Sequence, residues 1–271
     1  MAELTLENKA SLREMARIPT IAWPTFLMFI GALAIWSGGL AANAAGLLPA
    51  WLAVVTGFLS TYLLYMVMHE AAHGSISRHR WANTLVGSIA AIPFGGAYWL
   101  YRFAHLKHHS HTNHEKEDPD YYSGGAPLII HWFTQDFYYL EKYRNDPRRF
   151  TLLQRTQNLM QPAIVFGFMG WLIYLGYWQA VLFAWFLPWR LAIGWLAFAF
   201  NYLPHAPHEV EQRVNRFAAT VCRRPRALKW ILLFQNYHNI HHLYPSAPFY
   251  RMEKMWDVDP DYFEDNGTRV V

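Results

Sequence analysis

The most extended pattern along the chain is a run without charged residues from Ile18 to Met68. It contains no Asp, Glu, Lys or Arg, and as an α-helix its 51 residues would extend about 75 Å. That length is enough for two crossings of a hydrocarbon core about 30 Å thick. Asn, Gly and Pro cluster between Asn43 and Pro49, which is typical of a turn. The pattern therefore predicts two membrane-spanning helices, at residues 21–42 and 49–68.

Two further uncharged stretches, Thr156–Trp189 and Leu191–His208, lie on either side of Arg190. They predict a second helical hairpin, because together they are long enough for two more crossings. Its spans are expected at residues 162–182 and 187–205, with the turn near Leu187–Arg190.

Positive charge is distributed unequally about these four spans. Four crossings would put both termini and the segments 69–161 and 206–271 on one side of the membrane. Every Lys and Arg except Arg190 falls on that side, as the positive-inside rule expects of a cytoplasmic face. We therefore expect an all-α integral membrane protein, with four transmembrane helices in two hairpins and a cytoplasmic helical cap, in one domain of residues 1–271. Both termini and the active site would be cytoplasmic, in a bacterial inner membrane.

The composition supports a lipid environment. Hydrophobic residues make up 54% of the chain and charged residues only 15%, whereas a soluble domain contains about 25% charged residues. This disfavours the alternative of a soluble protein with buried helices. The net charge of +4 is explained by the cytoplasmic face, so we expect no nucleic-acid partner.

Residues 84–104 are apolar but are interrupted by Pro and Gly. A crossing here would put the residues that follow on the opposite face, so we expect a re-entrant or interfacial segment. Its aromatic residues Tyr98, Trp99 and Tyr101 are interpreted as part of an aromatic belt at the membrane surface. The alternative is that they line a substrate entrance.

The N-terminal residues 2–17 mix acidic, basic and apolar side chains. We expect an amphipathic interfacial helix anchored by Leu4, Leu12 and Met15. The segment lacks a short apolar core followed by a cleavage site, which disfavours a cleavable signal.

Histidines are concentrated in three clusters. Within a helix, offsets of three and four residues put side chains on one face. All three clusters fall on the cytoplasmic side of the predicted spans at about one depth, so we expect them to converge. They are His69 and His73 in H-E-A-A-H, His105, His108 and His109 in H-L-K-H-H, and His238, His241 and His242 in H-N-I-H-H.

These clusters predict a metal centre. A zinc site needs about four ligands, so eight clustered imidazoles point to two metal ions. Imidazole suits iron, zinc, copper and nickel, and the single Cys222 excludes an internal disulfide and a cysteine-ligated iron–sulfur cluster. We interpret the site as a pair of iron ions, because a site that opens onto lipid suits O2 activation on an apolar substrate better than hydrolysis.

Further ligands are expected at the cytoplasmic end of the last span. Asn201 and His205 are four residues apart, so both can point towards the clusters; a capping or snorkelling role is the alternative for His205. His111 and His114 follow the second cluster closely enough to be ligands, and His208 lies three residues after His205, but a solvated or supporting imidazole is the favoured interpretation for each. His79 and His131 are interpreted as structural.

Three carboxylates accompany the clusters. Glu70 lies inside the first cluster, and Asp118 and Asp120 follow the second by about ten residues. Metal-bound imidazoles usually donate their other N–H to a carboxylate or carbonyl, which fixes the tautomer. We expect these carboxylates to accept such bonds, with a simple Asx-Pro turn as an equal alternative for the Asp118-Pro119-Asp120 segment.

The three clusters have the forms H-x-x-x-H, H-x-x-H-H and H-x-x-H-H, with a long interval between the second and third. In these forms and this order they resemble the histidine boxes of the membrane-bound fatty acid desaturase and hydroxylase superfamily, over residues 20–255. The resemblance implies a non-haem centre of two iron ions, O2 as co-substrate and an electron donor outside the catalytic chain, such as ferredoxin. It also implies that His205, and Asn201 through water, complete the centre.

The sequences around the boxes are most similar to those of bacterial β-carotene hydroxylases. The similar stretches include H-L-K-H-H-S-H-T-N, N-Y-L-P-H-A-P-H-E and Q-N-Y-H-N-I-H-H-L-Y-P. The chain departs from those enzymes at Asn201, where they carry Asp, and at His208. The resemblance implies hydroxylation at carbon 3 of the β-carotene ring, with a lipid-soluble substrate that enters from the bilayer.

Two other functions are compatible with parts of the pattern. A fatty acyl lipid desaturase or hydroxylase is equally compatible with the histidines. A histidine-rich membrane metal transporter is a remote alternative, because the predicted spans lack ionisable residues for an ion pathway.

No flavin, haem or cysteine-cluster motif accompanies the boxes, so electrons are expected from an external donor. The basic run Arg223–Arg226 with Lys229 is interpreted as a site for anionic lipid headgroups. Docking of an acidic ferredoxin on this run is the alternative.

Overall fold

The computed structural model describes residues 2–145 and 147–271. They form a mostly helical protein, with a small parallel sheet in which β1 (Val221–Cys222) pairs with β2 (Arg269–Val270). The α-helices are α1 (Leu6–Met15), α2 (Trp23–Ala44), α3 (Ala50–His73), α4 (Arg80–Ala90), α5 (Tyr98–His111), α6 (Leu128–Asn145), α7 (Leu152–Tyr174), α8 (Trp178–Ala180), α9 (Leu187–Leu196), α10 (His238–Leu243), α11 (Met252–Trp256) and α12 (Pro260–Asp265).

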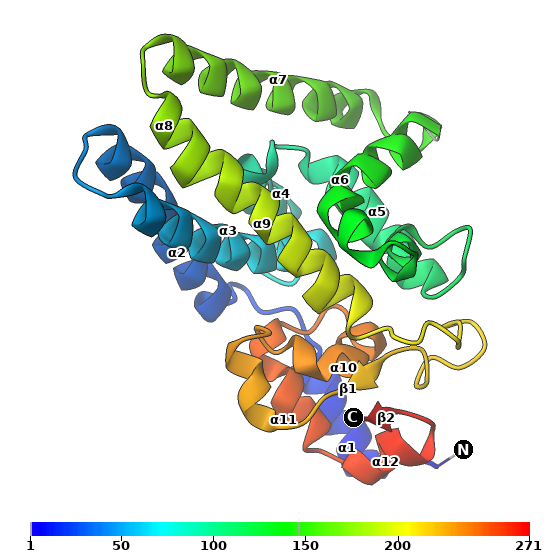
Figure 1. The fold of residues 1–271 in the computed structure, drawn as a ribbon. Coiled ribbons are helices and arrows are strands. Elements are labelled where there is room, and N and C mark those ends of the chain that lie inside the picture. The colour runs from blue at the N-terminus through cyan, green and yellow to red at the C-terminus, as the bar shows by residue number, and fades with distance from the viewer. Residues whose placement is uncertain (1, 146) are drawn as a thin grey trace.

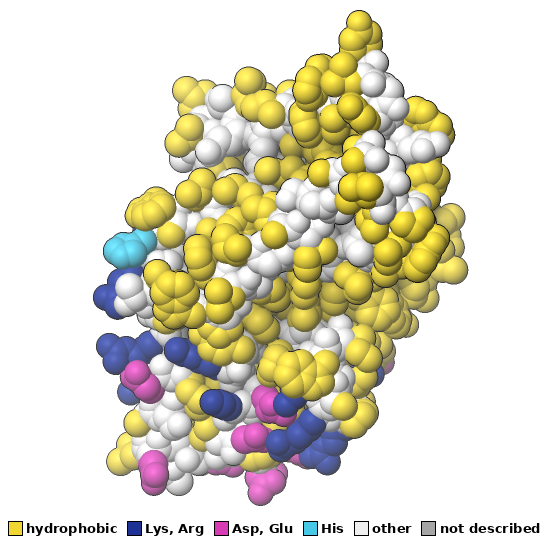
Figure 2. Space-filling view, turned by 90° about the vertical axis from the view of Figure 1, so that its left-hand side faces the viewer, with side chains coloured by type: hydrophobic (Ala, Val, Ile, Leu, Met, Phe, Trp, Pro, Cys, Tyr) yellow, Lys and Arg dark blue, Asp and Glu magenta, His cyan; other side chains and the backbone are white. Residues whose placement is uncertain are grey.

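The long helices and the short ones occupy different parts of the molecule. The helices α2, α3 and α8–α9 run alongside one another, while α10, α11 and α12 lie with α1 and the sheet at their lower ends (Figure 1). Both termini belong to this lower layer. On the face shown in Figure 2, hydrophobic side chains cover the upper part and charged ones gather on the lower part.

The first predicted hairpin is confirmed. Helix α2 ends at Ala44 and α3 begins at Ala50, so the turn falls within the predicted Asn43–Pro49 segment. Helix α3 continues beyond the predicted span as far as His73 and ends at Gly74, which adopts the left-handed conformation (φ 73°) that glycine tolerates best. The first histidine cluster therefore lies on the last turns of a long, rigid helix.

The second hairpin is predicted in the wrong place. Helix α7 ends at Tyr174, and the chain turns at Leu175–Tyr177, where Gly176 has a φ of 92°. A continuous helix then runs from Trp178 to Tyr202, with π-helical turns at η4 (Val181–Phe186) and η5 (Ala197–Tyr202). Pro188, which marked the predicted turn, lies inside this helix.

The π-helical turn η4 explains why Pro188 does not end the helix. Proline lacks the N–H that an α-helix would use at this position. The π-helical turn η4 ends just before Pro188 and departs from the regular α-helical hydrogen-bond pattern. The helix can therefore continue although Pro188 has no backbone N–H. Because the helix begins at Trp178, Arg190 lies near its middle and not in a loop on the far side of the membrane.

Three helices of the described chain are long and apolar enough to cross a membrane: α2, α3 and the Trp178–Tyr202 helix. Helix α7 is also long, but its N-terminal half carries Gln154, Arg155, Gln157 and Asn158, and it is not one of the three. The count of four spans and the cytoplasmic position of the cap therefore stay predictions.

The N-terminal helix packs against the C-terminal part of the chain. Leu12 is 1% exposed within the protein core, and Leu4 is also buried there. Asn8 donates to Asp259 across 3.0 Å, and Arg251 donates to the carbonyl of Met15 across 2.8 Å. The prediction that Leu4 and Leu12 anchor this helix in lipid is therefore wrong, because both side chains are buried within the protein.

The apolar segment 84–104 is broken as predicted, between the end of α4 at Ala90 and the start of α5 at Tyr98. Its tyrosines are not a membrane belt, since Tyr98 and Tyr101 are both buried in the core. Tyr98 packs against Gly87 of α4, where any side chain would collide with the tyrosine ring. The segment therefore forms an internal wall, and its aromatic residues face protein.

Candidate metal centre

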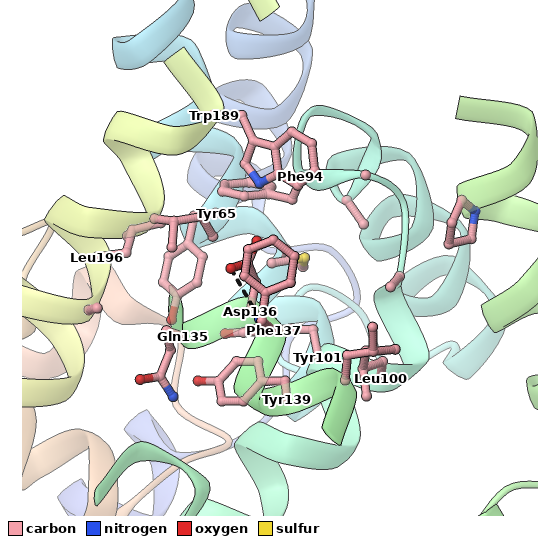
Figure 3. A pocket seen from close by; sticks show the side chains of 18 of the residues that line it. Tyr65, Phe94, Leu100, Tyr101, Gln135, Asp136, Phe137, Tyr139, Trp189 and Leu196 are labelled. Carbon is pink, nitrogen blue, oxygen red and sulfur yellow. Dashed lines mark hydrogen bonds between the residues drawn. The ribbon is translucent and has the colours of Figure 1, made fainter. Parts of the chain in front are cut away.

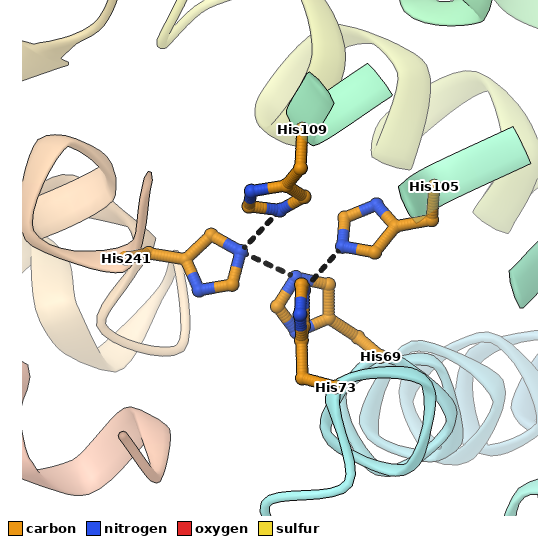
Figure 4. Close-up of side chains that lie close together, drawn as sticks. All are labelled: His69, His73, His105, His109 and His241. Carbon is orange, nitrogen blue, oxygen red and sulfur yellow. Dashed lines mark hydrogen bonds between the residues drawn. The ribbon is translucent and has the colours of Figure 1, made fainter. Parts of the chain in front are cut away.

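Five histidines from three helices converge on one point. Helix α3 supplies His69 and His73, α5 supplies His105 and His109, and α10 supplies His241 (Figure 4). The Nε2 atoms of His73 and His105 lie 2.7 Å apart, and that of His241 lies 3.1 Å from His69 and 3.0 Å from His109. We call these residues the five-histidine group.

A second group contains four buried histidines: His108, His205, His238 and His242. The Nε2 atom of His242 lies 3.3 Å from that of His108 and 3.0 Å from that of His238. The Nε2 atom of His205 lies 2.9 Å from that of His238. We call these residues the four-histidine group; it contains His205, which was predicted from its place at the end of the last long helix.

Helical spacing explains how the boxes divide between the groups. In the second box, His105 and His109 are four residues apart and point to the five-histidine group, whereas His108 points to the other. In the third box, His238 and His242 point to the four-histidine group and His241 to the first. Each of these two boxes therefore contributes to both groups, which holds the groups side by side.

The chemistry of these donors fits metal ions. Metal–imidazole distances are about 2.1 Å, so neighbouring ligands at right angles lie about 3 Å apart, close to the observed Nε2 separations of 2.7–3.3 Å. Burial lowers the pKa of His105, His109 and His241 well below its usual value, and those of His205, His238 and His242 as well. These rings are therefore neutral at pH 7, with lone pairs that can bind a cation.

Polar side chains hold the outer ring nitrogens of three of the four histidines in the four-histidine group; that of His205 has no partner among the described residues. The Nδ1 atom of His108 lies 2.8 Å from Asp118, that of His238 lies 2.7 Å from the Oε1 atom of Gln235, and that of His242 lies 2.9 Å from the Oε1 atom of Gln212. Such bonds fix the tautomer that leaves Nε2 free. The sequence reasoning missed both glutamines, although Gln235 stands one helical turn before His238.

Asp118 performs both of the roles considered for it. It accepts from His108 and also caps its own turn by accepting from the backbone N–H of Asp120 across 2.8 Å. Burial alone would lower the pKa of His108, but the charges of Asp118 and Asp120 raise it to about 9. Burial raises the pKa of Asp120 to about 6, and its Oδ2 atom lies 3.7 Å from His108.

Glu70 does not orient a histidine ring in the described structure. Its carboxylate instead accepts the backbone N–H of Phe249 across 3.2 Å, and thereby fixes the segment that follows the third box. The predicted bond to an imidazole is therefore not formed among the described residues; the partner of the Glu70 carboxylate is the loop after the third box.

Asn201 is buried in the π-helical turn η5, four residues before His205. Its side-chain N–H donates to the hydroxyl of Tyr139 across 3.3 Å, and Tyr139 in turn donates to Asp120 across 2.5 Å. Its predicted contact with a metal ion through water stays a prediction. No sequence pattern indicated Tyr139, which comes from α6.

The remaining histidines lie outside both groups. His111 contacts Ser110 at 2.7 Å, and His114 accepts backbone N–H groups of its own loop. His131 contacts the carbonyl of Tyr122, and His79 precedes α4. His208 stacks on His205 with ring centroids 6.1 Å apart, and burial lowers its pKa to about 4.

An apolar cavity of about 290 Å³ adjoins the histidine groups. Its walls come from α3, α5, α6, α7 and the Trp178–Tyr202 helix, and the aromatic rings of Tyr65, Phe94, Tyr101, Phe137 and Trp189 surround it (Figure 3). At its inner end, the ring of Tyr101 stacks on His105 with centroids 5.5 Å apart and an interplanar angle of 8°. A single layer of side chains therefore separates the cavity from the five-histidine group.

Comparison with known proteins identifies the family. The sequence profile of the fatty acid desaturase family matches residues 45–271, which include all nine converging histidines. The chain belongs to the fatty acid desaturase family. As a fatty acid desaturase family member it is an oxidoreductase, and its histidine groups and apolar helices mark it as a membrane protein with an iron-binding site. This excludes the metal transporter that the histidines alone left open.

Its relatives act on different lipids. The chain is 26% identical to the sn-1 oleoyl-lipid 12-desaturase of Picosynechococcus sp., over 88% of this chain and 76% of that protein. It is 29% identical to the β-carotene ketolase of Paracoccus sp., over 70% of this chain and 72% of the ketolase. The chloroplastic omega-6 fatty acid desaturase of Spinacia oleracea is 26% identical, over 86% of this chain and 58% of that enzyme.

Proposed function

We propose that this protein uses O2 and two iron ions to hydroxylate carbon 3 of the β-carotene ring. The observation that carries the proposal is the cavity of about 290 Å³ beside the histidine groups. Seven of its twenty lining residues are aromatic, and they can stack on a flat ring and on the conjugated chain attached to it. A relative named for action on β-carotene, the ketolase of Paracoccus sp., supports the same substrate class.

The two histidine groups would each hold one iron ion. Iron bound there would supply the activation of O2 that oxidation of an unactivated C–H bond requires. The residues of the chain contribute geometry and the exclusion of water. Asp118, Gln212 and Gln235 hold the outer nitrogens of His108, His242 and His238, so that the inner nitrogens keep their positions.

The inner end of the cavity would orient the substrate. Tyr65 and Tyr101 form its wall on the histidine side, and Tyr101 stacks on His105. Tyr139 and Asn201 are polar residues of the lining and are joined by a hydrogen bond of 3.3 Å. A ring placed against these side chains would lie one side-chain layer from the five-histidine group, while the rest of the substrate occupies the apolar part.

The experiment that tests the substrate is expression in a bacterium engineered to make β-carotene, with pigments analysed by liquid chromatography and mass spectrometry. We expect zeaxanthin and its monohydroxylated precursor, formed by the addition of one oxygen atom per ring. The matched control is the His242→Ala variant, which should leave β-carotene unchanged. Unchanged β-carotene in cells that contain iron-loaded wild-type protein would rule out this substrate.

A second candidate is desaturation or hydroxylation of a fatty acyl lipid. It is favoured by the cyanobacterial relatives, which are named as oleoyl-lipid desaturases and match 88% and 85% of this chain. The same cells should therefore have their fatty acids analysed by gas chromatography and mass spectrometry. A new double bond or hydroxyl group in the acyl chains, with no change in the pigments, would select this alternative.

An external electron donor such as ferredoxin is part of the proposal. The basic run expected to bind headgroups or a donor is largely paired within the cap, since Arg226 forms a salt bridge with Asp257 at 2.6 Å and Lys229 one with Glu253 at 2.5 Å. Arg224 lies 3.9 Å from Glu264. If ferredoxin docks there, Arg224→Glu should lower the ferredoxin-dependent rate without changing the iron content; an unchanged rate at low salt would rule out docking.

A further inference from the structure

The cavity is open to the surface at the side formed by α6 and α7. Three of its lining residues are also strongly exposed: Phe137 is 61% exposed, Leu140 53% and Phe166 50%. Other lining residues, such as Leu196 and Ala197, are buried. The cavity therefore runs from a rim of exposed apolar side chains on α6 and α7 to buried side chains near the histidines.

The surface around this rim is also apolar. On α6, Ile129, Ile130 and Phe133 continue the exposed face that includes Phe137 and Leu140, at the spacing of one helical side. On α7, Met160 and Ile164 are exposed beside Phe166. Exposed apolar side chains of this kind on a membrane protein favour contact with lipid tails, and on α6 they share one side of the helix with the rim residues Phe137 and Leu140.

An ion pair holds the two sides of the cavity together next to the rim. Arg190, near the middle of the apolar Trp178–Tyr202 helix, donates to Asp136 of α6, which itself lines the cavity. The same guanidinium donates to the backbone carbonyl of Phe133 and lies over the rings of Phe137 and Trp189, 5.4 Å from each centroid. Ionisable side chains in an apolar helix are costly, and they are typically retained where they have a role.

We propose that this rim is the entrance by which the lipid-soluble substrate passes sideways from the bilayer into the cavity, with the Asp136–Arg190 pair positioning α6 at its edge. The proposal rests on the proposed function for the class of substrate, a long apolar molecule dissolved in the membrane. Such a molecule would meet mostly apolar side chains along the route, at the rim, in the walls and on the surrounding surface. Asp136 and Arg190 act as positioning residues: they set the width of the opening and do not reach the histidine groups.

The entrance can be tested without measuring oxidation. Wild-type protein with bound iron is placed in lipid nanodiscs, and a small hydrocarbon that carries a photoreactive diazirine is added to the bilayer. Irradiation at increasing times after mixing, followed by peptide mass spectrometry, measures how fast the probe reaches Leu196 and Ala197 inside the cavity. Labelling of Ile35, an exposed residue of α2, reports the amount of probe in the bilayer.

Bulky substitutions at the rim should slow entry. We expect Leu140→Trp and, separately, Phe166→Trp to lower the rate of cavity labelling by about fivefold or more, with labelling of Ile35 and the iron content unchanged. The matched control is Ile130→Trp, since Ile130 is 59% exposed on the same helix but does not line the cavity. Cavity labelling at the wild-type rate in both rim variants would overturn the proposal, and so would failure of the probe to label the cavity in the wild-type protein.

The role of the ion pair is tested by removing both charges together, since removal of one alone would leave the other unpaired. The double variant Asp136→Ala/Arg190→Met should keep its iron and label the cavity faster than the wild type, because α6 is no longer fixed to the long helix. An unchanged labelling rate would show that the pair does not set the opening. These readouts do not depend on which lipid is oxidised, so failure of the entrance and failure of the proposed β-carotene hydroxylation can be told apart.

Discussion

The Nδ1 atom of His108 lies 2.8 Å from the Oδ1 atom of Asp118, while its Nε2 atom faces that of His242 at 3.3 Å. The carboxylate therefore holds the ring from outside as the other nitrogen points into the four-histidine group. Asp118 is itself fixed, because it accepts the backbone N–H groups of Asn113 and Asp120, each across 2.8 Å. A loop that follows the second histidine box thus determines where one ligand of the box points.

Substitution of Asp118 by Asn should weaken iron binding at the four-histidine group. The amide can no longer hold the His108 ring as a charged acceptor, and loss of such a partner typically lowers metal affinity about 10- to 100-fold. Competition with a chelator measures the change. Glu117→Gln is the matched control, since Glu117 is exposed and pairs with Lys107; equal losses in both variants would show that the Asp118–His108 bond has no special role.

Iron binding to the metal-free protein should depend on pH through His108. Its pKa, about 9, means that the ring carries an extra proton below that pH, and a metal ion must displace this proton from Nε2. Affinity at the four-histidine group should therefore rise with pH, about tenfold per unit, and level off above pH 9. Calorimetry in buffers of different ionisation enthalpy measures the proton released; an affinity independent of pH would contradict this assignment. In Asp118→Asn, only Asp120 is left to raise the pKa of His108, so the iron affinity should level off at a lower pH.

The packing of α3 against the Trp178–Tyr202 helix should depend on Gly57. A methyl group there would lie 2.7 Å from the Cγ atom of Pro188 and 2.8 Å from the carbonyl oxygen of Ala184. Gly57→Ala should therefore lower the free energy of unfolding by about 1–3 kcal/mol, measured as a lower thermal midpoint in detergent. Gly31→Ala is the control, because nothing lies within 4 Å of its added carbon. Equal midpoints for the two variants would show that the helices can separate at no cost.

The sequence was sufficient to single out all nine histidines that converge in the two groups. Spacings of three and four residues placed the box histidines on helix faces, and the end of the last apolar helix indicated His205. The division of these histidines into two groups depends on which helix faces pack together. It follows from the packing of α3, α5 and α10, and it cannot be predicted from the boxes alone.

The errors have one physical origin, which is that local sequence does not record long-range partners. Pro188 looked like a turn, but the π-helical turn before it absorbs its missing N–H. Glu70 stands between two ligands in sequence, yet its partner is the distant backbone of Phe249. Tyr101 is of a residue type that is common in aromatic belts at membrane surfaces, but in the structure its ring stacks on that of His105. The shape of the cavity depends on α6. The contact between Asp136 of this helix and Arg190 could not be predicted from any spacing in the sequence.

The metal content of purified protein tests most directly whether the two histidine groups hold a pair of iron ions. Inductively coupled plasma mass spectrometry should find two iron ions per chain in the wild type, one for each histidine group. His109→Ala in the five-histidine group and His242→Ala in the four-histidine group should each lose iron and activity, whereas His79→Ala, outside both groups, should keep both. Wild-type protein with a single ion or with loosely exchanging zinc, or full iron content and activity in His242→Ala, would show that the two groups do not hold such a pair.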